Sequence, residues 1–148
     1  MAHFFRLSEL EKVLGISRDS VRGWLQRGLF RYEGRERGPG VDKLYSSQDA
    51  TLLVVATRMV QAGVEPRVAW TAIYDSRKHL DDGSVQYLAV APAEYGFEYW
   101  AVSDVASLLR IFEPYGRRGP DVITVVAVGL IRAEVERRLR EYLEDDAK

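Results

Sequence analysis

Three polar residues that can recognise nucleic acid recur at intervals of four positions: Arg18, Arg22 and Gln26. Residues four positions apart are neighbours on a helix surface, so these side chains would form one row. Arginine can form two hydrogen bonds to guanine or to a phosphate group, and glutamine can form two to adenine. Gly23, on the same face, weakens a helix by about 1 kcal/mol relative to alanine, but it would let a bulky partner approach closely. The row predicts a surface that contacts DNA.

A charged, glycine-rich segment follows this row. Residues 29–45 have short apolar or aromatic flanks around a Gly-Pro-Gly tip, which is typical of a hairpin with a long loop. Arg35, Arg37 and Lys43 lie along this segment. Phosphate contacts need flexible cations more than a defined geometry. The hairpin therefore predicts a basic wing at residues 30–45.

Catalytic and metal chemistry have little support in the sequence. The chain contains no cysteine and only two histidines, His3 and His79. These counts exclude disulfides, thiolate metal sites and iron–sulfur clusters, and they leave no histidine cluster. Ser103 and Ser107 have no histidine nearby in the sequence, and no glycine-rich phosphate motif follows a predicted strand. We therefore expect no enzyme, no catalytic or metal-binding residues and no cofactor.

Two short helices joined by a tight turn would position the polar row. The first begins at Ser8, whose spacing to Glu11 fits a capping box, and Gly15 is placed to end it. Ser17 caps the second helix, and Gly28 ends it. This arrangement predicts a helix-turn-helix. The apolar side of the second helix comprises Val21, Trp24 and Leu25.

Two further helices complete the first half of the chain. Ser46 or Ser47 caps a helix that runs to about Ala62. Pro66 suits the first position of the next helix, because a proline needs no backbone N–H there. This helix runs to about Lys78. The turn at residues 81–84 is the best candidate for a domain boundary.

The second half has a different periodicity and predicts a small ββαβα unit. The boundary separates a domain at 1–80 from one at 84–148. Residues 122–128 are almost all apolar or β-branched, the pattern of a strand buried on both faces. Two strands, at 85–91 and 97–102, are joined by residues 92–96. Ser103 or Asp104 caps a helix whose apolar face comprises Val105, Leu108, Leu109 and Phe112. The final helix has an apolar stripe of Ile131, Val135, Leu139, Tyr142 and Leu143.

Six aromatic residues of the second half allow two interpretations. They could line a small-molecule pocket, or they could form core and cross-strand pairs. We interpret most of them as packing residues. They are Tyr87, Tyr95, Phe97, Tyr99, Trp100 and Tyr115.

The net charge of −1 conceals an asymmetry. Residues 1–80 contain 13 Lys or Arg and 9 Asp or Glu, a net charge of +4. Residues 81–148 contain 8 Lys or Arg and 13 Asp or Glu, a net charge of −5. Such a difference suggests separate roles for the halves. No apolar run is long enough to span a bilayer, and the first residues lack the features of a signal peptide, so we expect a cytoplasmic location without membrane contact.

Three motifs resemble those of MerR-type regulators. Residues 17–29 (SRDSVRGWLQRGL) resemble the recognition helix of that family. Residues 45–49 (YSSQD) are similar to its Tyr-Ser-x-x-Asp motif at the start of the third helix, and Gly63-Val64 resembles its break before the fourth. The resemblance covers roughly residues 4–78. A β-containing region then replaces the long dimerising helix of the family.

The resemblance implies a winged helix-turn-helix and a homodimer on DNA with two half-sites. It implies that Arg22 grips DNA and that Arg35, Arg37 and Lys43 are wing contacts. The same segment also resembles excisionase-type winged helices of mobile elements. An excisionase-like DNA-bending accessory factor of a mobile element or phage is therefore an alternative function. An antitoxin-like protein-interaction adaptor, whose acidic second half would bind a basic or nucleic-acid-mimicking partner, is another.

We expect an α+β protein that acts as a sequence-specific DNA-binding transcriptional regulator. Its partners would be double-stranded DNA and a second copy bound through the C-terminal half, and an unidentified small-molecule effector is a further candidate. The candidate DNA-binding residues are Ser17, Arg18, Asp19, Ser20, Arg22, Gly23, Gln26, Arg35, Arg37, Lys43 and Tyr45.

Overall fold

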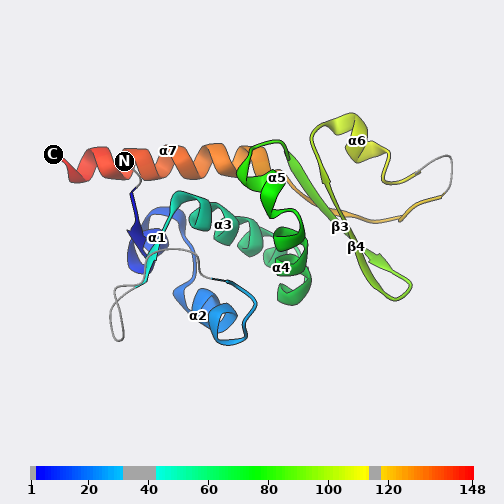
Figure 1. Cartoon of the computed structure of the whole chain (residues 1–148), viewed down its shortest axis with the longest axis horizontal. Helices are drawn as coiled ribbons and strands as arrows, with labels where there is room; N and C mark the ends of the chain where they lie inside the picture. Colours follow the sequence, from blue (N-terminus) through cyan, green and yellow to red (C-terminus); the bar gives the residue numbers. More distant parts are fainter. Residues whose placement is uncertain (1–2, 32–42, 114–117) are drawn as a thin grey trace. The chain divides into compact units, whose positions relative to one another are not determined.

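The computed structural model describes residues 3–31, 43–113 and 118–148, which form a mixed helix and sheet structure (Figure 1). The chain divides into two compact units. Unit 1 comprises Met1–Thr57 and Ile131–Lys148, and unit 2 comprises Arg58–Leu130. These units differ from the predicted domains at 1–80 and 84–148, because the last helix groups with the N-terminal residues. The division into domains at 1–80 and 84–148 stays a prediction.

Unit 1 combines a two-stranded sheet with several helices. Strand β1 (Phe5–Arg6) pairs antiparallel with β2 (Leu44–Tyr45), so that Phe5 lies opposite Tyr45. The helices are α1 (Leu7–Leu14), α2 (Arg18–Gln26), most of α3 (Ser47–Gln61) and most of α7 (Val128–Asp146). The buried apolar residues include Phe5, Leu10, Ile16, Val21, Trp24, Phe30, Tyr45, Leu53, Val55, Val135 and Leu139.

Helix α1 begins directly after β1, which changes the predicted cap. The backbone N–H of Arg6 donates to Glu9 Oε1 (2.9 Å), so Glu9 performs the role that we predicted for Glu11. The predicted Ser8–Glu11 capping box is therefore wrong, because the end of the strand places the cap at Arg6. Gly15 ends the helix with φ of +71°, as predicted.

The C-terminal helix α7 contacts α1 within unit 1. The hydroxyl of Tyr142 donates to Glu9 Oε2 (2.7 Å), and this hydrogen bond to a carboxylate raises the pKa of Tyr142. Val135 and Leu139 on the predicted apolar stripe of α7 are buried. These two residues of the stripe thus pack as expected. The Glu9 carboxylate accepts hydrogen bonds from the Arg6 backbone at the start of α1 and from Tyr142 of α7.

The starts of α3 and α4 follow the predicted signals. Ser46 and Asp49 cap α3 reciprocally: each backbone N–H donates to the side-chain oxygen of the other residue (3.1 and 3.0 Å). Pro66 is the first residue of α4 (Pro66–Asp75). The predicted helix to Lys78 is interrupted at Ser76, where ψ is −1°, and α5 (Arg77–Asp81) follows.

The sheet of unit 2 has the strand order β4-β3-β5 and is antiparallel throughout. The strands are β3 (Tyr87–Ala93), β4 (Gly96–Val102) and β5 (Thr124–Val126). Strands β3 and β4 form the long hairpin in Figure 1. Pro92 and Ala93 belong to β3 and pair with Phe97 and Gly96, so the turn is shorter than predicted.

The strand buried on both faces is β3, and the prediction for residues 122–128 is wrong. Four successive residues of the central strand are buried, from Leu88 to Ala91. Strand β5 has three residues and lies at the sheet edge, where Val125 is 39% exposed; Val122, which precedes the strand, is 69% exposed. An apolar, β-branched run alone does not distinguish an edge strand from a central one.

Helix α6 (Val105–Leu109) is capped by Asp104, whose Oδ1 accepts from Ser107 N–H (2.7 Å). This hydrogen bond lowers the pKa of Asp104. The predicted apolar face of α6 is buried only in part: Leu108 and Phe112 are partly buried, whereas Val105 is 53% and Leu109 63% exposed. Five residues make too few turns to cover a sheet with a complete stripe.

Phe97 and Tyr99 of β4 are partly buried and pack on each other along one strand, not across strands, and Phe97 also lines a hollow of unit 2. The rings of Phe97 and Tyr99 lie 6.1 Å apart, and the hydroxyl of Tyr99 donates to the carboxylate of Asp75 in α4. Tyr95, at the hairpin turn, is 91% exposed. Tyr115 lies outside the described residues.

Candidate nucleic-acid interface

Helix α2 has the ends that the sequence predicts. The Ser17 hydroxyl oxygen accepts from the backbone N–H of Ser20 (3.2 Å), which satisfies one of the free donors at the start of the helix. Gly28 follows the helix with φ of +68°, a conformation that glycine adopts without strain. These two residues define the ends of α2, a helix of nine residues that contains the polar row.

The two faces of α2 have different environments. Val21 and Trp24 are 0% and 5% exposed and hold the helix in unit 1. The other face is open to solvent, as predicted. Its exposed residues are Arg18, Asp19, Ser20, Arg22 and Gln26.

Gly23 leaves open space on the solvent side of α2. A Cβ atom built at this position meets no other atom within 4 Å. The chain itself therefore does not require glycine here. The close approach of a partner to this glycine stays a prediction.

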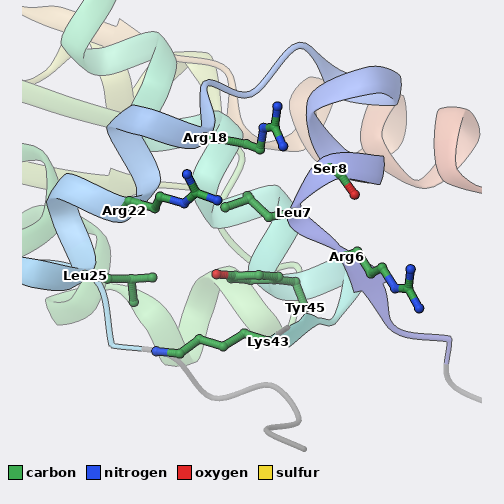
Figure 2. Close-up of a pocket in the computed structure, with 8 residues that line it drawn as sticks. All are labelled: Arg6, Leu7, Ser8, Arg18, Arg22, Leu25, Lys43 and Tyr45. Atoms are coloured by element: carbon green, nitrogen blue, oxygen red, sulfur yellow. The ribbon is translucent and has the colours of Figure 1, made fainter. Parts of the chain in front are cut away.

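A hollow of about 340 Å³ lies beside this face, and we call it the basic hollow (Figure 2). It is formed by the end of β1, the start of α1, helix α2 and the segment at β2. Its lining contains four cationic residues and no acidic one. The lining residues are Arg6, Leu7, Ser8, Arg18, Arg22, Leu25, Lys43 and Tyr45.

The three arginines of the basic hollow, Arg6, Arg18 and Arg22, are at most lightly neutralised by the described residues. Arg18 Nε forms an ion pair with Glu11 Oε1 (2.9 Å), and both side chains are close to half exposed. An exposed pair of this kind contributes about 1 kcal/mol or less, so a phosphate group can compete for Arg18. Within the described ranges, no carboxylate forms an ion pair with Arg6 or Arg22.

Tyr45 forms part of the wall of the hollow. Its ring is 2% exposed and stacks on Phe30, with ring centroids 6.3 Å apart. Its hydroxyl group points toward Leu25 of α2 (Figure 2). The ring thus packs in unit 1 while its polar end faces the hollow.

The structure brings four of the predicted site residues to the basic hollow: Arg18, Arg22, Lys43 and Tyr45. The other described candidates on α2 and its cap do not line it: Ser17, Asp19, Ser20, Gly23 and Gln26. Arg35 and Arg37 lie outside the described residues.

Sequence reasoning missed the contribution of β1 and the start of α1. Arg6, Leu7 and Ser8 line the hollow because β1 pairs with β2. Two residues make too short a strand to be recognised from alternation. The cation at Arg6, next to the buried Phe5, was the available signal.

In the described part of the chain, no helix is long and apolar enough to cross a membrane, and no cluster of potential metal ligands occurs.

Two searches of known proteins complement this geometry. No curated protein matches the chain. The model of the family described as MerR HTH family regulatory protein matches residues 5–70. This match includes α1, α2, β2 and α3, and it confirms the predicted resemblance. The N-terminal part of the chain, residues 5–70, is thus similar to MerR-type helix-turn-helix regulators.

Proposed function

We propose that this protein is a sequence-specific DNA-binding transcriptional regulator that acts in the cytoplasm. The observation that carries the proposal is the basic hollow beside the exposed face of α2. Four cations from three separate segments converge on it. Such convergence favours a polyanionic partner, and the neighbouring helix face offers groups that can read bases.

We assign different contacts to the two parts of this surface. Helix α2 would enter the major groove, where Arg22 and Gln26 can form paired hydrogen bonds to base edges. Arg6, Arg18 and Lys43 would contact phosphates and fix the register of the helix on the duplex. Arg35 and Arg37 would extend the phosphate contacts along the wing.

We also propose that two copies bind one operator and associate through residues 84–148. The net charge of −5 over residues 81–148 opposes binding to DNA and suits this region to a different role. Two copies related by a two-fold axis would place two α2 helices on two half-sites.

Selection of duplexes from a random library by the full chain tests this function. We expect enrichment of two inverted half-sites, separated by one helical turn of DNA or a multiple of it. Binding without enrichment of any sequence would contradict a sequence-specific regulator. Several phased sites with a large bend would support the excisionase-like alternative instead.

A further inference from the structure

Unit 2 contains a second hollow, of about 570 Å³. It lies between the turn that joins α3 to α4 and one end of the three-stranded sheet, and we call it the sheet hollow. Its volume is typical of sites that bind small molecules, which measure about 300–1,000 Å³. The lining residues are Gly63, Val64, Glu65, Arg67, Val68, Val90, Ala91, Pro92, Gly96, Phe97 and Thr124.

The lining of the sheet hollow is mainly apolar and includes residues of all three strands. Val90 lies opposite Thr124 of β5, and Pro92 lies opposite Phe97 of β4. These residues therefore share one face of the sheet. The ring of Phe97 and the side chains of Val64 and Val68 are partly exposed, so they offer an apolar surface that a ligand can cover.

Two opposite charges stand at the sheet hollow. Glu65 and Arg67 flank Pro66 at the start of α4, and both are exposed. Within the part of the chain that the structure describes, neither the Glu65 carboxylate nor the Arg67 guanidinium group forms an ion pair or hydrogen bond, although the backbone carbonyl of Arg67 accepts from the Thr71 hydroxyl. One carboxylate and one guanidinium group are thus available to a ligand in the same hollow.

We infer that the sheet hollow binds a small zwitterion with an apolar or aromatic side chain, such as an apolar amino acid. The carboxylate of the ligand would bind Arg67, whose planar guanidinium can form two parallel hydrogen bonds to it. The ammonium group would face Glu65, and the side chain would cover Phe97 and Val68. A ligand with only a carboxylate would be repelled by Glu65.

Titration of the full chain with L-phenylalanine, followed by amide NMR and calorimetry, tests this inference. We expect saturable shifts at Gly63, Val64 and Gly96. N-acetyl-L-phenylalanine lacks the ammonium group and L-phenylalaninamide lacks the carboxylate, so each should bind about tenfold more weakly or worse.

Two exposed variants and one control sharpen the test. Arg67→Gln should weaken binding of phenylalanine about tenfold or more, and Glu65→Gln should abolish the preference for phenylalanine over its N-acetyl derivative. Arg110→Gln, an exposed change outside the lining of the hollow, should bind like the unaltered chain.

Absence of saturable shifts with phenylalanine, leucine and valine would overturn the inference. Equal binding of phenylalanine and both derivatives, or normal binding by Arg67→Gln, would overturn it as well. The experiment contains no DNA, so its result is independent of the proposed regulatory function.

Discussion

Replacing Arg22 by alanine should lower the affinity of the full chain for its selected duplex by about 10- to 100-fold. Arg22 is exposed on α2, lines the basic hollow and has no ion-pair partner among the described residues. Its removal therefore takes away a contact to DNA and leaves the packing of the chain intact. Fluorescence anisotropy at fixed salt measures the affinity, and a thermal melt confirms that the midpoint is unchanged.

Arg27→Ala is the matched control for this variant. Arg27 follows the last turn of α2, is exposed and does not line the basic hollow. The control substitution removes the same charge from the same part of the chain, so general electrostatic attraction falls equally. If Arg27→Ala weakened binding as much as Arg22→Ala, the hollow would not be the binding surface.

Replacing Trp24 by alanine should lower the free energy of unfolding by about 3–5 kcal/mol. Trp24 is 5% exposed and lies on the face of α2 opposite the polar row. Its removal takes away apolar burial and leaves a cavity under the helix. The midpoint of thermal unfolding should fall by roughly 10 °C.

Trp24→Phe should reduce stability less than half as much, because the phenyl ring fills part of the same space. Together with Arg22→Ala, these variants separate the two faces of α2. We expect one face to determine stability and the other to determine DNA affinity. An unchanged melting midpoint for Trp24→Ala would contradict the packing of α2 described above.

Helix ends were the features that the sequence predicted best. Ser17, Gly15, Gly28 and Pro66 all occupy the positions that their chemistry suggests. Each signal depends on hydrogen bonds or backbone angles within a few residues. Such local physics needs no knowledge of the tertiary fold.

The basic hollow could be predicted only in part. Arg18 and Arg22 follow from helix periodicity, and Lys43 from the charge of the wing. Arg6 joins them because Phe5 pairs with Tyr45, forty positions later in the chain. The pairing of these two-residue strands depends on the packing of Phe5 and Tyr45, and no local sequence pattern predicts it.

Burial in the second half was the least predictable feature. Residues 122–128 are richer in β-branched residues than β3, yet β3 is the central strand. Strand order depends on contacts between distant residues, so composition assigned burial to the wrong strand. The exposure of Val105 and Leu109 has a similar cause, because α6 ends after five residues.

The salt dependence of DNA binding tests the central claim most directly. The logarithm of the association constant falls linearly with the logarithm of the salt concentration, by about 0.9 for each phosphate that the protein neutralises on a duplex. The full chain, an Arg6→Gln/Lys43→Gln variant and an Arg27→Gln/Arg140→Gln control would be compared on the selected duplex. Both control positions are exposed and lie outside the basic hollow. We predict that the slope of the hollow variant is shallower by about 0.9 for each phosphate that it no longer neutralises, while the control keeps the slope of the unaltered chain. Equal slopes for the hollow variant and the unaltered chain would contradict binding of DNA phosphates by this hollow.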